Sequence, residues 1–247
     1  MPRVTVRGDI GFPGHPVAKN VDICFESGGL NCILGPNGSG KTTLLLTIGG
    51  ALKPLKGRVE ITPNDATRIY VPPSPPLLPG FRVGDVLLYL MSSQSKMTVY
   101  DTRINPRVCE EVLEELGFNY HLDRYFDELS TGEKQKVVLA GAIASSSSIL
   151  LLDEPNSHLD LKSRTLLYRI LKREASKRLV IAALHDVNEA CMYCDKVVLM
   201  GRGRVLGGPG HPSDMLCLEK LEEAYGISFE PVEHKGRILY FPSTSST

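Results

Sequence analysis

The sequence predicts an α/β fold with a mostly parallel β-sheet, a small antiparallel β layer and an inserted helical subdomain, on three observations. Between residues 149 and 200, short apolar runs alternate with segments of helical periodicity, which is the pattern of parallel strands joined by helices. A glycine-rich loop, Gly35–Thr42, stands between an apolar run and a helical segment. A proline-rich stretch at 72–80 then breaks the alternation, and helical periodicity follows it.

The first part of the chain is expected to form strands around one helix. Three alternating segments separated by turn residues would make the antiparallel layer, and the others belong to a core with a parallel sheet. The expected elements are strands at 3–7, 20–26, 30–34, 57–61 and 68–71 and a helix at 42–48.

The proline-rich stretch is expected to be an extended connector, because proline at that density fits neither a helix nor a central strand. A helical insertion runs from residue 83 to about residue 129, strands and helices then alternate, and a helix and two strands form the tail. The expected elements after the insertion are strands at 149–153, 179–184, 196–200, 228–232 and 237–241 and helices at 161–173, 187–194 and 218–225.

The composition is that of a globular chain without a strong net charge. With 247 residues and 42% hydrophobic content, the chain can bury a full core. It has 28 basic and 28 acidic residues, and the net charge of 0 argues against a nucleic-acid partner. No apolar run approaches the ~20 residues of a membrane-spanning helix. Because no secretory segment precedes the first strand pattern, we expect a cytoplasmic location without direct membrane insertion.

Six cysteines are scattered mostly among apolar neighbours, without the spacing of a disulfide framework. We therefore expect small buried hydrophobic residues. Cys191 and Cys194 match the pattern C-x-x-C, but no second pair completes a four-ligand metal site. A spacing of three in a predicted helix favours two thiols that face the core.

The glycine-rich loop has the pattern of a phosphate-binding loop, G-x-x-x-x-G-K-[ST]. In such a loop the backbone N–H groups surround a phosphate, Lys41 reaches the β and γ phosphates, and the Thr42 hydroxyl binds magnesium. The predicted strand before the loop and helix after it are the context that this motif requires, because a helix N-terminus favours anions. The loop predicts a nucleoside triphosphate with Mg²⁺.

Two acidic residues, Asp153 and Glu154, end the apolar run 149–152. Asp153 is expected to reach the magnesium ion, and Glu154 to polarise the water that attacks the γ-phosphate. His185 follows the next apolar run and would lie near the γ-phosphate as a hydrogen-bonding sensor. The expected catalytic residues are therefore Lys41, Glu154 and His185, and the expected metal ligands are Thr42 and Asp153.

The order and spacing of these motifs resemble the ATPase subunit of an ABC transporter over about the whole chain. The resemblance rests on the segments Gly35–Thr42, Leu129-Ser130-Thr131-Gly132-Glu133, Ile149–Glu154, Ser157-His158-Leu159-Asp160 and His185. It implies one domain over residues 1–247. The expected parts are a nucleotide-binding core with the antiparallel layer (1–75 and 135–210), a helical subdomain with the signature (76–134) and a C-terminal extension (211–247).

The resemblance also implies a head-to-tail homodimer that encloses two ATP molecules and works on a transmembrane permease. Ser130 and Gly132 would reach the ATP of the other copy, Asp160 would report between the two sites, and Phe12 would stack on adenine. The residues expected to bind ATP are Phe12, Gly35, Pro36, Asn37, Gly38, Ser39, Gly40, Lys41, Thr42, Thr43, Ser130, Gly132 and Asp160.

Two positions depart from the family pattern. Thr131 replaces the first glycine of the signature, which is tolerable if its backbone is not left-handed. Pro73 stands where these subunits carry a glutamine that contacts magnesium, and proline has no side-chain ligand. We expect slow but real hydrolysis.

The tail, from 207 to 241, is similar to that of importer ATPases for iron chelates, haem or cobalamin. This suggests an ATPase peripheral to the inner face of the cell membrane, where it would be held by a permease partner. Two alternatives remain open. One is a soluble ABC-type ATPase without a membrane partner, and the other is a nucleotide-gated dimerisation module with weak hydrolysis.

Overall fold

Six strands form the central sheet of the computed structural model, which describes residues 1–92, 106–119 and 121–243. The strand order is β5-β6-β7-β3-β8-β9, and all neighbours pair in parallel except β8 and β9. This confirms the predicted mostly parallel sheet. The strands are β3 (Leu30–Leu34), β5 (Arg68–Val71), β6 (Ile149–Asp153), β7 (Leu179–Leu184), β8 (Lys196–Gly201) and β9 (Arg204–Gly210).

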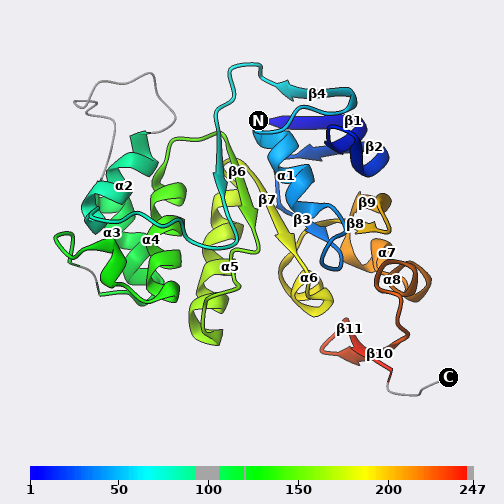
Figure 1. Ribbon diagram of the computed structural model, residues 1–247. Coiled ribbons are helices and arrows are strands. Elements are labelled where there is room, and N and C mark those ends of the chain that lie inside the picture. The colour runs from blue at the N-terminus through cyan, green and yellow to red at the C-terminus, as the bar shows by residue number, and fades with distance from the viewer. Residues whose placement is uncertain (93–105, 120, 244–247) are drawn as a thin grey trace.

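A second sheet of three antiparallel strands, in the order β2-β1-β4, forms the predicted antiparallel layer (Figure 1). Its strands are β1 (Arg3–Phe12), β2 (His15–Glu26) and β4 (Lys56–Thr62). The first two are longer than the sequence suggested, because register shifts near Gly8 and Ile10 let the pairing continue past the glycines.

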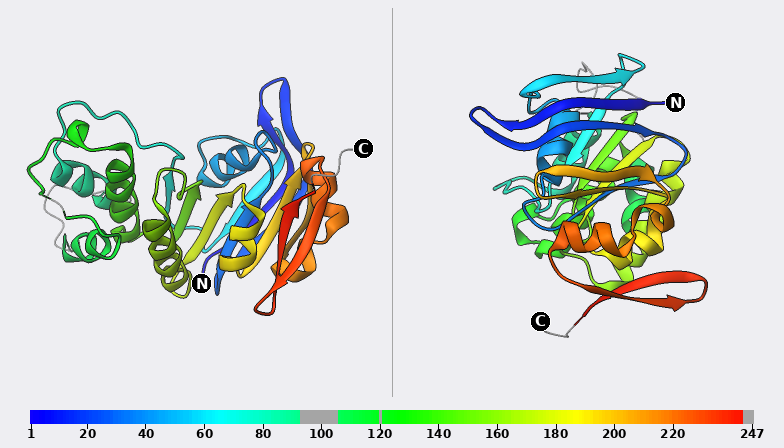
Figure 2. Two further views of the ribbon diagram at one scale, coloured as in Figure 1. Left: turned by 90° about the horizontal axis from the view of Figure 1, so that it is seen from below. Right: turned by 90° about the vertical axis from the view of Figure 1, so that its right-hand side faces the viewer.

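The central sheet is buried on both faces, and successive residues of each strand enter different cores. In β6, Leu150 and Leu152 face one apolar cluster, while Leu151 faces the other. The second cluster lies between the two sheets and includes residues of α1 (Lys41–Gly49). Helices α5 (Leu161–Ala175) and α6 (Val187–Tyr193) contribute to the first cluster. Figure 2 shows these layers from two further sides.

The helical subdomain stands beside the sheet, on the left of Figure 1. The connector before it, which includes 72–80, contains neither helix nor strand, as predicted. The expected division between 134 and 135 falls inside α4, which packs on α2 and α3 and also contacts β5. The elements are α2 (Val83–Ser92), α3 (Pro106–Glu115), the 3-10 helix η1 (Phe126–Glu128) and α4 (Thr131–Ala144).

The C-terminal extension contains the predicted helix and a two-stranded ribbon, with one short helix that the sequence did not predict. Asn188 of α6 holds the ribbon by two hydrogen bonds, because its Nδ2 donates to the Tyr240 carbonyl and its Oδ1 accepts from the Tyr240 N–H. The elements are α7 (Pro212–Met215), α8 (Leu218–Tyr225), β10 (Phe229–His234) and β11 (Arg237–Pro242).

A disulfide joins Cys32 of β3 to Cys194, 162 residues later, at the end of α6. The expectation of free buried thiols is therefore wrong for these two residues. The strand register explains the pairing, since Asn31 lies opposite Lys196 and the chain reaches β8 directly after Cys194. Cys24, Cys109, Cys191 and Cys217 are free, and Cys217 is exposed.

Among the helices that the structure describes, none combines the length and the apolar character needed to cross a membrane.

Candidate functional site

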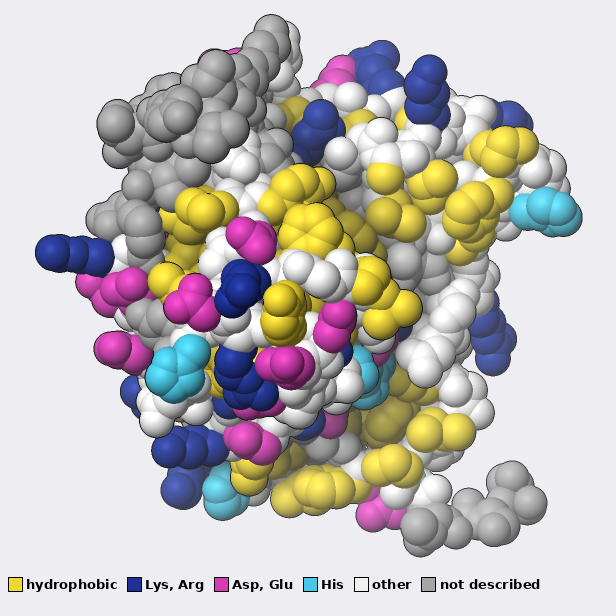
Figure 3. All heavy atoms as spheres, turned by 60° about the vertical axis from the view of Figure 1, so that its left-hand side comes forward, with side chains coloured by type: hydrophobic (Ala, Val, Ile, Leu, Met, Phe, Trp, Pro, Cys, Tyr) yellow, Lys and Arg dark blue, Asp and Glu magenta, His cyan; other side chains and the backbone are white. Residues whose placement is uncertain are grey.

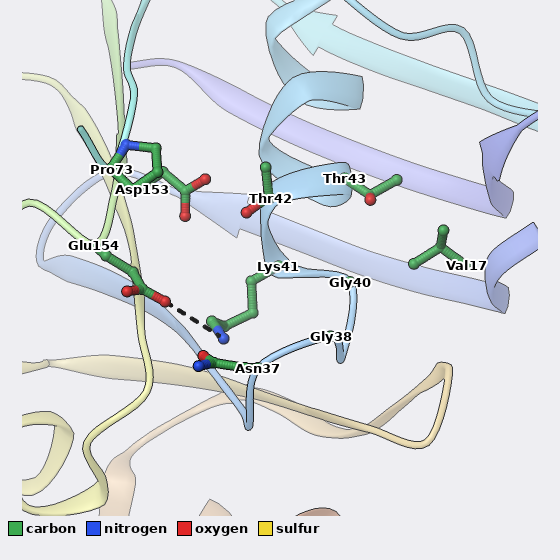
Figure 4. A pocket seen from close by; sticks show the side chains of 10 residues that line it. All are labelled: Val17, Asn37, Gly38, Gly40, Lys41, Thr42, Thr43, Pro73, Asp153 and Glu154. Atoms are coloured by element: carbon green, nitrogen blue, oxygen red, sulfur yellow. Dashed lines mark ion pairs between the residues drawn. The ribbon is translucent and has the colours of Figure 1, made fainter. Parts of the chain in front are cut away.

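A cavity of about 490 Å³ opens where β3 and β6 end, at the carboxyl edge of the parallel strands. This edge is where open α/β sheets bind ligands. Figure 4 shows the side chains of Lys41 and Glu154 directed toward each other and that of Asp153 directed toward Thr42. The residues that line the cavity are Val17, Asn37, Gly38, Gly40, Lys41, Thr42, Thr43, Pro73, Asp153 and Glu154.

The loop before α1 requires glycine at two positions for different reasons. Gly40 caps the helix with φ +105°, which is a left-handed conformation that side chains disfavour. At Gly35, a Cβ atom would lie 2.3 Å from the Met200 carbonyl oxygen. The Ser39 hydroxyl in this loop is buried without a hydrogen-bond partner among the described residues. An unpaired hydroxyl and the positive end of α1 both suit an anionic ligand such as a phosphate.

Lys41 is the first residue of α1 and is almost fully buried. Its Nζ donates to the carbonyl oxygens of Gly35 (2.8 Å) and Pro36 (3.1 Å) and lies 3.9 Å from Glu154 Oε1. Burial lowers the pKa of the Lys41 ammonium, and the nearby carboxylates of Glu154 and Asp153 oppose this shift. The ammonium thus lies on the floor of the cavity, among oxygen atoms that a phosphate oxygen would replace.

Asp153 ends β6 with its side chain in the cavity wall and 1% exposed. Burial raises the pKa of its carboxyl group, whereas hydrogen bonds from the Thr42 and Tyr70 hydroxyls act in the opposite direction. The Tyr70 hydroxyl donates to Oδ2 at 3.1 Å. Thr42 and Asp153 together offer the hard oxygen donors that Mg²⁺ prefers, so these residues fit the ion.

Glu154 follows Asp153 with a left-handed backbone, φ +44°. Its N–H donates to the Ala183 carbonyl of β7, and this bond holds the residue against the neighbouring strand. Its Oε2 lies 3.4 Å from His185 Nδ1, while its Oε1 faces Lys41. The two loops that follow β6 and β7 therefore bring one carboxylate between an ammonium and an imidazole.

The segment after Glu154 is fixed by its neighbours. The Ser157 hydroxyl donates to the Pro73 carbonyl at 3.0 Å, and the Ser74 hydroxyl lies 3.3 Å from His158 Nε2. Asn156 donates to the buried carboxylate of Glu189 on α6. This segment thus touches both the proline connector and the helix that follows His185.

Seven of the expected ATP-binding residues do not line the cavity. Gly35, Pro36 and Ser39 belong to the phosphate loop itself, and the other four lie in other elements. Phe12 lies at the exposed end of β1. Ser130 caps the N-terminus of α4, Gly132 lies in the first turn of that helix, and Asp160 caps α5 by accepting a bond from the Ser163 N–H. Within one chain the side chains of Ser130 and Asp160 thus serve as helix caps.

Sequence reasoning missed Val17 and Tyr70. Val17 lines the cavity from β2, and its Cγ1 would lie 3.0 Å from a Cβ built at Gly40. Tyr70 reaches Asp153 from the neighbouring strand. Neither belongs to a short motif, and both act through contacts between segments distant in the chain. Thr131 has no left-handed backbone, so it is accommodated in the signature.

Known protein sequences that are similar to this chain come from one family. A family model described as ABC transporter matches residues 18–157. The chain is 31% identical to the hemin import ATP-binding protein of Rhizobium meliloti over 88% of both chains. It is 29% identical to the cobalamin import ATP-binding protein of Halobacterium salinarum over 88% of this chain and 57% of that protein.

Solved structures give the same fold. An ATP-binding protein from Pyrococcus furiosus described as an ABC transporter has a TM-score of 0.67 and 28% identity, over 80% of this chain and 97% of that one. A metal-chelate type ABC transporter in an inward-facing conformation has a TM-score of 0.81 at 23% identity and covers 98% of both chains. The latter likeness concerns the fold alone.

Proposed function

This chain belongs to the ABC transporter family as an ATP-binding subunit and ATPase, and we propose that it energises import of an iron chelate, haem or cobalamin. One observation carries the proposal of hydrolysis. Glu154 lies at the cavity between Lys41, 3.9 Å away, and His185, 3.4 Å away. In this position the Glu154 carboxylate can polarise an attacking water, while Lys41 stabilises charge on the phosphates.

Thr42 and Asp153 would hold the magnesium ion, which supplies charge neutralisation at the β and γ phosphates. The protein itself contributes by placing its own groups around the phosphates. The loop at 35–42 binds the phosphates, Lys41 offsets their charge, and His185 accepts or donates a hydrogen bond beside Glu154.

A homodimer is part of this proposal. Ser130 and Gly132 lie at the exposed N-terminus of α4, a helix of 14 residues, and its positive end is suited to an anion. They do not line the cavity of their own chain, so we assign them to the ATP of a second, head-to-tail copy. Asp160 caps α5 at the end of the loop that begins with Glu154, and it would contact the second copy.

The transmembrane permease would bind the helical subdomain and the connector. Leu77, within the proline-rich stretch, is 88% exposed, and Phe81, just after it, is 48% exposed. In the helical subdomain, a hollow of about 210 Å³ between α2 and α3 is lined mostly by apolar residues, among them Leu88 and Leu122. Figure 3, which turns the left-hand side of Figure 1 forward, shows hydrophobic side chains gathered among charged ones. Such a face would hold the chain at the inner side of the membrane.

The proposed binding to a permease is tested by purifying the chain from detergent-solubilised membranes of its own host and identifying the proteins that accompany it. We expect a stoichiometric polytopic membrane protein, which Leu77→Glu with Phe81→Glu removes and the exposed control Ile227→Glu retains. Recovery in the soluble fraction alone would instead support the soluble ATPase.

Hydrolysis is tested with Glu154→Gln. Phosphate release should fall by about 10²-fold or more, the usual contribution of a general base, while the affinity for a nonhydrolysable ATP analogue changes little. Glu128→Gln, in η1, is the matched control and should retain full activity. Equal phosphate release by Glu154→Gln and the wild-type protein would contradict the assignment.

One observation favours the second candidate, a nucleotide-gated dimerisation module with weak hydrolysis. Pro73 lines the cavity and offers no donor or ligand from its side chain. Pro73→Gln should raise the rate and alter its Mg²⁺ dependence. If both stay unchanged, this position has no role at the metal. Analogue-driven dimerisation without any phosphate release in the wild-type protein would establish the module.

A further inference from the structure

We propose that Tyr70 is a positioning residue that orients Asp153 and thereby sets the affinity of the site for its divalent cation. The inference rests on the proposed ATPase function and deepens it, because the mechanism above assigns no role to Tyr70. Its hydroxyl donates to Asp153 Oδ2 at 3.1 Å. Tyr70 does not line the cavity, so its influence passes through the Asp153 carboxylate.

The strand register explains how Tyr70 reaches Asp153. Strands β5 and β6 are parallel, and Tyr70 lies opposite Leu151. Asp153 is two residues further along β6, so its side chain leaves the same face of the sheet as that of Leu151. Diagonal neighbours of this kind are within reach of a long aromatic side chain. A phenol spans the gap that a shorter side chain at residue 70 would leave.

The ring of Tyr70 is itself anchored. It is partly buried and packs against the apolar cluster between the two sheets, to which α1 also contributes. The hydroxyl is thereby carried on a ring whose position is set by the core. The Thr42 side chain, which shares the cation site, points toward Asp153 from α1 (Figure 4) and favours its charged form. The carboxylate thus lies between the Tyr70 hydroxyl, to which it is hydrogen-bonded, and the Thr42 hydroxyl.

Among the side chains that the structure describes, Tyr70 is the one that is hydrogen-bonded to Asp153 without being an expected ligand of the cation. Lys41 directs its hydrogen bonds to the carbonyls of Gly35 and Pro36, and Pro73 has no side-chain donor. Ligand carboxylates are usually held by hydrogen bonds from residues that do not touch the metal, and loss of such a partner typically weakens metal binding. Tyr70 is in the position to be that partner.

The test is Tyr70→Phe, which removes the hydroxyl and keeps the ring. Mn²⁺ is titrated by electron paramagnetic resonance into protein saturated with a nonhydrolysable ATP analogue, and the affinity for the analogue is measured separately in EDTA. We expect Mn²⁺ affinity to fall about tenfold, with an unchanged metal-free analogue affinity. Tyr89→Phe, an exposed tyrosine of α2, is the matched control and should leave both affinities unchanged.

The outcomes separate this inference from the proposed function. Wild-type protein that binds the analogue but no Mn²⁺ would overturn the metal site and the inference together. Wild-type Mn²⁺ binding that Tyr70→Phe leaves within about twofold would overturn the inference alone. A fall of both affinities by the same factor, with a lower melting temperature, would show a merely structural role and would also overturn it.

Discussion

At the scale of one residue, Asp153 occupies a position that suits the functional site but lowers the stability of the folded protein. Its carboxylate is almost fully buried, and burial raises its pKa above the ordinary value of 3.8. The two hydroxyl bonds oppose that effect only in part, because they are neutral donors. The negative charge of Asp153 would be better solvated in water than it is in the folded protein, but it lies where a cation can bind to it.

Replacement of this carboxylate should therefore stabilise the protein without ligands. We expect Asp153→Asn to raise the free energy of unfolding by about 1 kcal/mol, which corresponds to a melting temperature about 2–4 °C higher for a chain of this size. Asn can accept the same hydroxyl bonds but carries no charge. Differential scanning fluorimetry without nucleotide, with Asp127→Asn of η1 as the control, would measure the gain.

The gain should depend on pH in a defined direction. Because the pKa of Asp153 is raised in the folded state, the wild-type protein loses stability as pH rises from about 4 through that raised value. Below this window both states of the wild-type protein carry a neutral carboxyl, and Asp153→Asn should have no advantage. An advantage that grows toward low pH would contradict the assignment of the charge to this carboxyl.

At the scale of elements, helix α4 is fixed at both ends by side chains. Its N-terminus has a capping box in which Glu133 accepts from the Ser130 N–H while the Ser130 hydroxyl accepts from the Glu133 N–H. Beyond its C-terminus the guanidinium of Arg178, which precedes β7, donates to the carbonyls of Ile143, Ser145 and Ser147. The helix that presents Ser130 is therefore tied to the central sheet.

The first prediction for α4 concerns its buried C-terminal end. Arg178 is almost fully buried and pairs with Glu174 at 2.9 Å. Arg178→Leu would leave several carbonyls unpaired and would remove the buried partner of Glu174, whose exposed partner Lys177 remains at 3.0 Å, and we expect a loss of about 3 kcal/mol in the free energy of unfolding by urea. Lys177→Leu, whose side chain is largely exposed, is the control and should change it by less than about 0.5 kcal/mol. Equal effects of the two substitutions would contradict this role.

The second prediction concerns the capping box. Glu133→Ala removes the acceptor of the Ser130 N–H and should cost about 1 kcal/mol of unfolding free energy. Glu133→Gln is the matched control, because glutamine preserves the reciprocal bonds. If Glu133→Gln destabilised the protein as much as Glu133→Ala does, charge at the helix N-terminus would be the cause in place of the hydrogen bonds.

The comparison of sequence and structure is most instructive for elements that escaped prediction. The sequence predicted the buried strands β3, β6 and β7, since each is a mostly apolar run, and pointed to the functional candidates at or after their ends: Lys41, Asp153, Glu154 and His185. Helix α4 gave little amphipathic signal because it is buried on most sides, from Val137 to Ile143. Strand β9 was hidden by its glycines and proline, which an antiparallel edge tolerates. The Tyr70 contact needed the strand register, which no local pattern provides.

At the scale of the whole molecule, the disulfide crosses the core that positions the site. It joins the strand that leads into the phosphate loop to the helix that follows His185. Reduction should lower the free energy of unfolding by about 2–4 kcal/mol, the typical contribution of a disulfide. Urea unfolding with and without a phosphine reductant measures the loss, and Cys32→Ala with Cys194→Ala should be insensitive to the reductant. The same sensitivity in that double variant would assign the effect to another cysteine.

The same bond makes residues 32 to 194 a closed covalent ring that contains β5, the helical subdomain, α5 and β7. A single peptide-bond cut by a protease anywhere within that ring cannot separate the chain into two molecules. The nicked protein should therefore migrate in a denaturing gel as one band of full mass, and it should divide into two fragments on addition of thiol. Cuts outside the ring, in the antiparallel hairpin before β3 or in the C-terminal ribbon, should release their fragments at once.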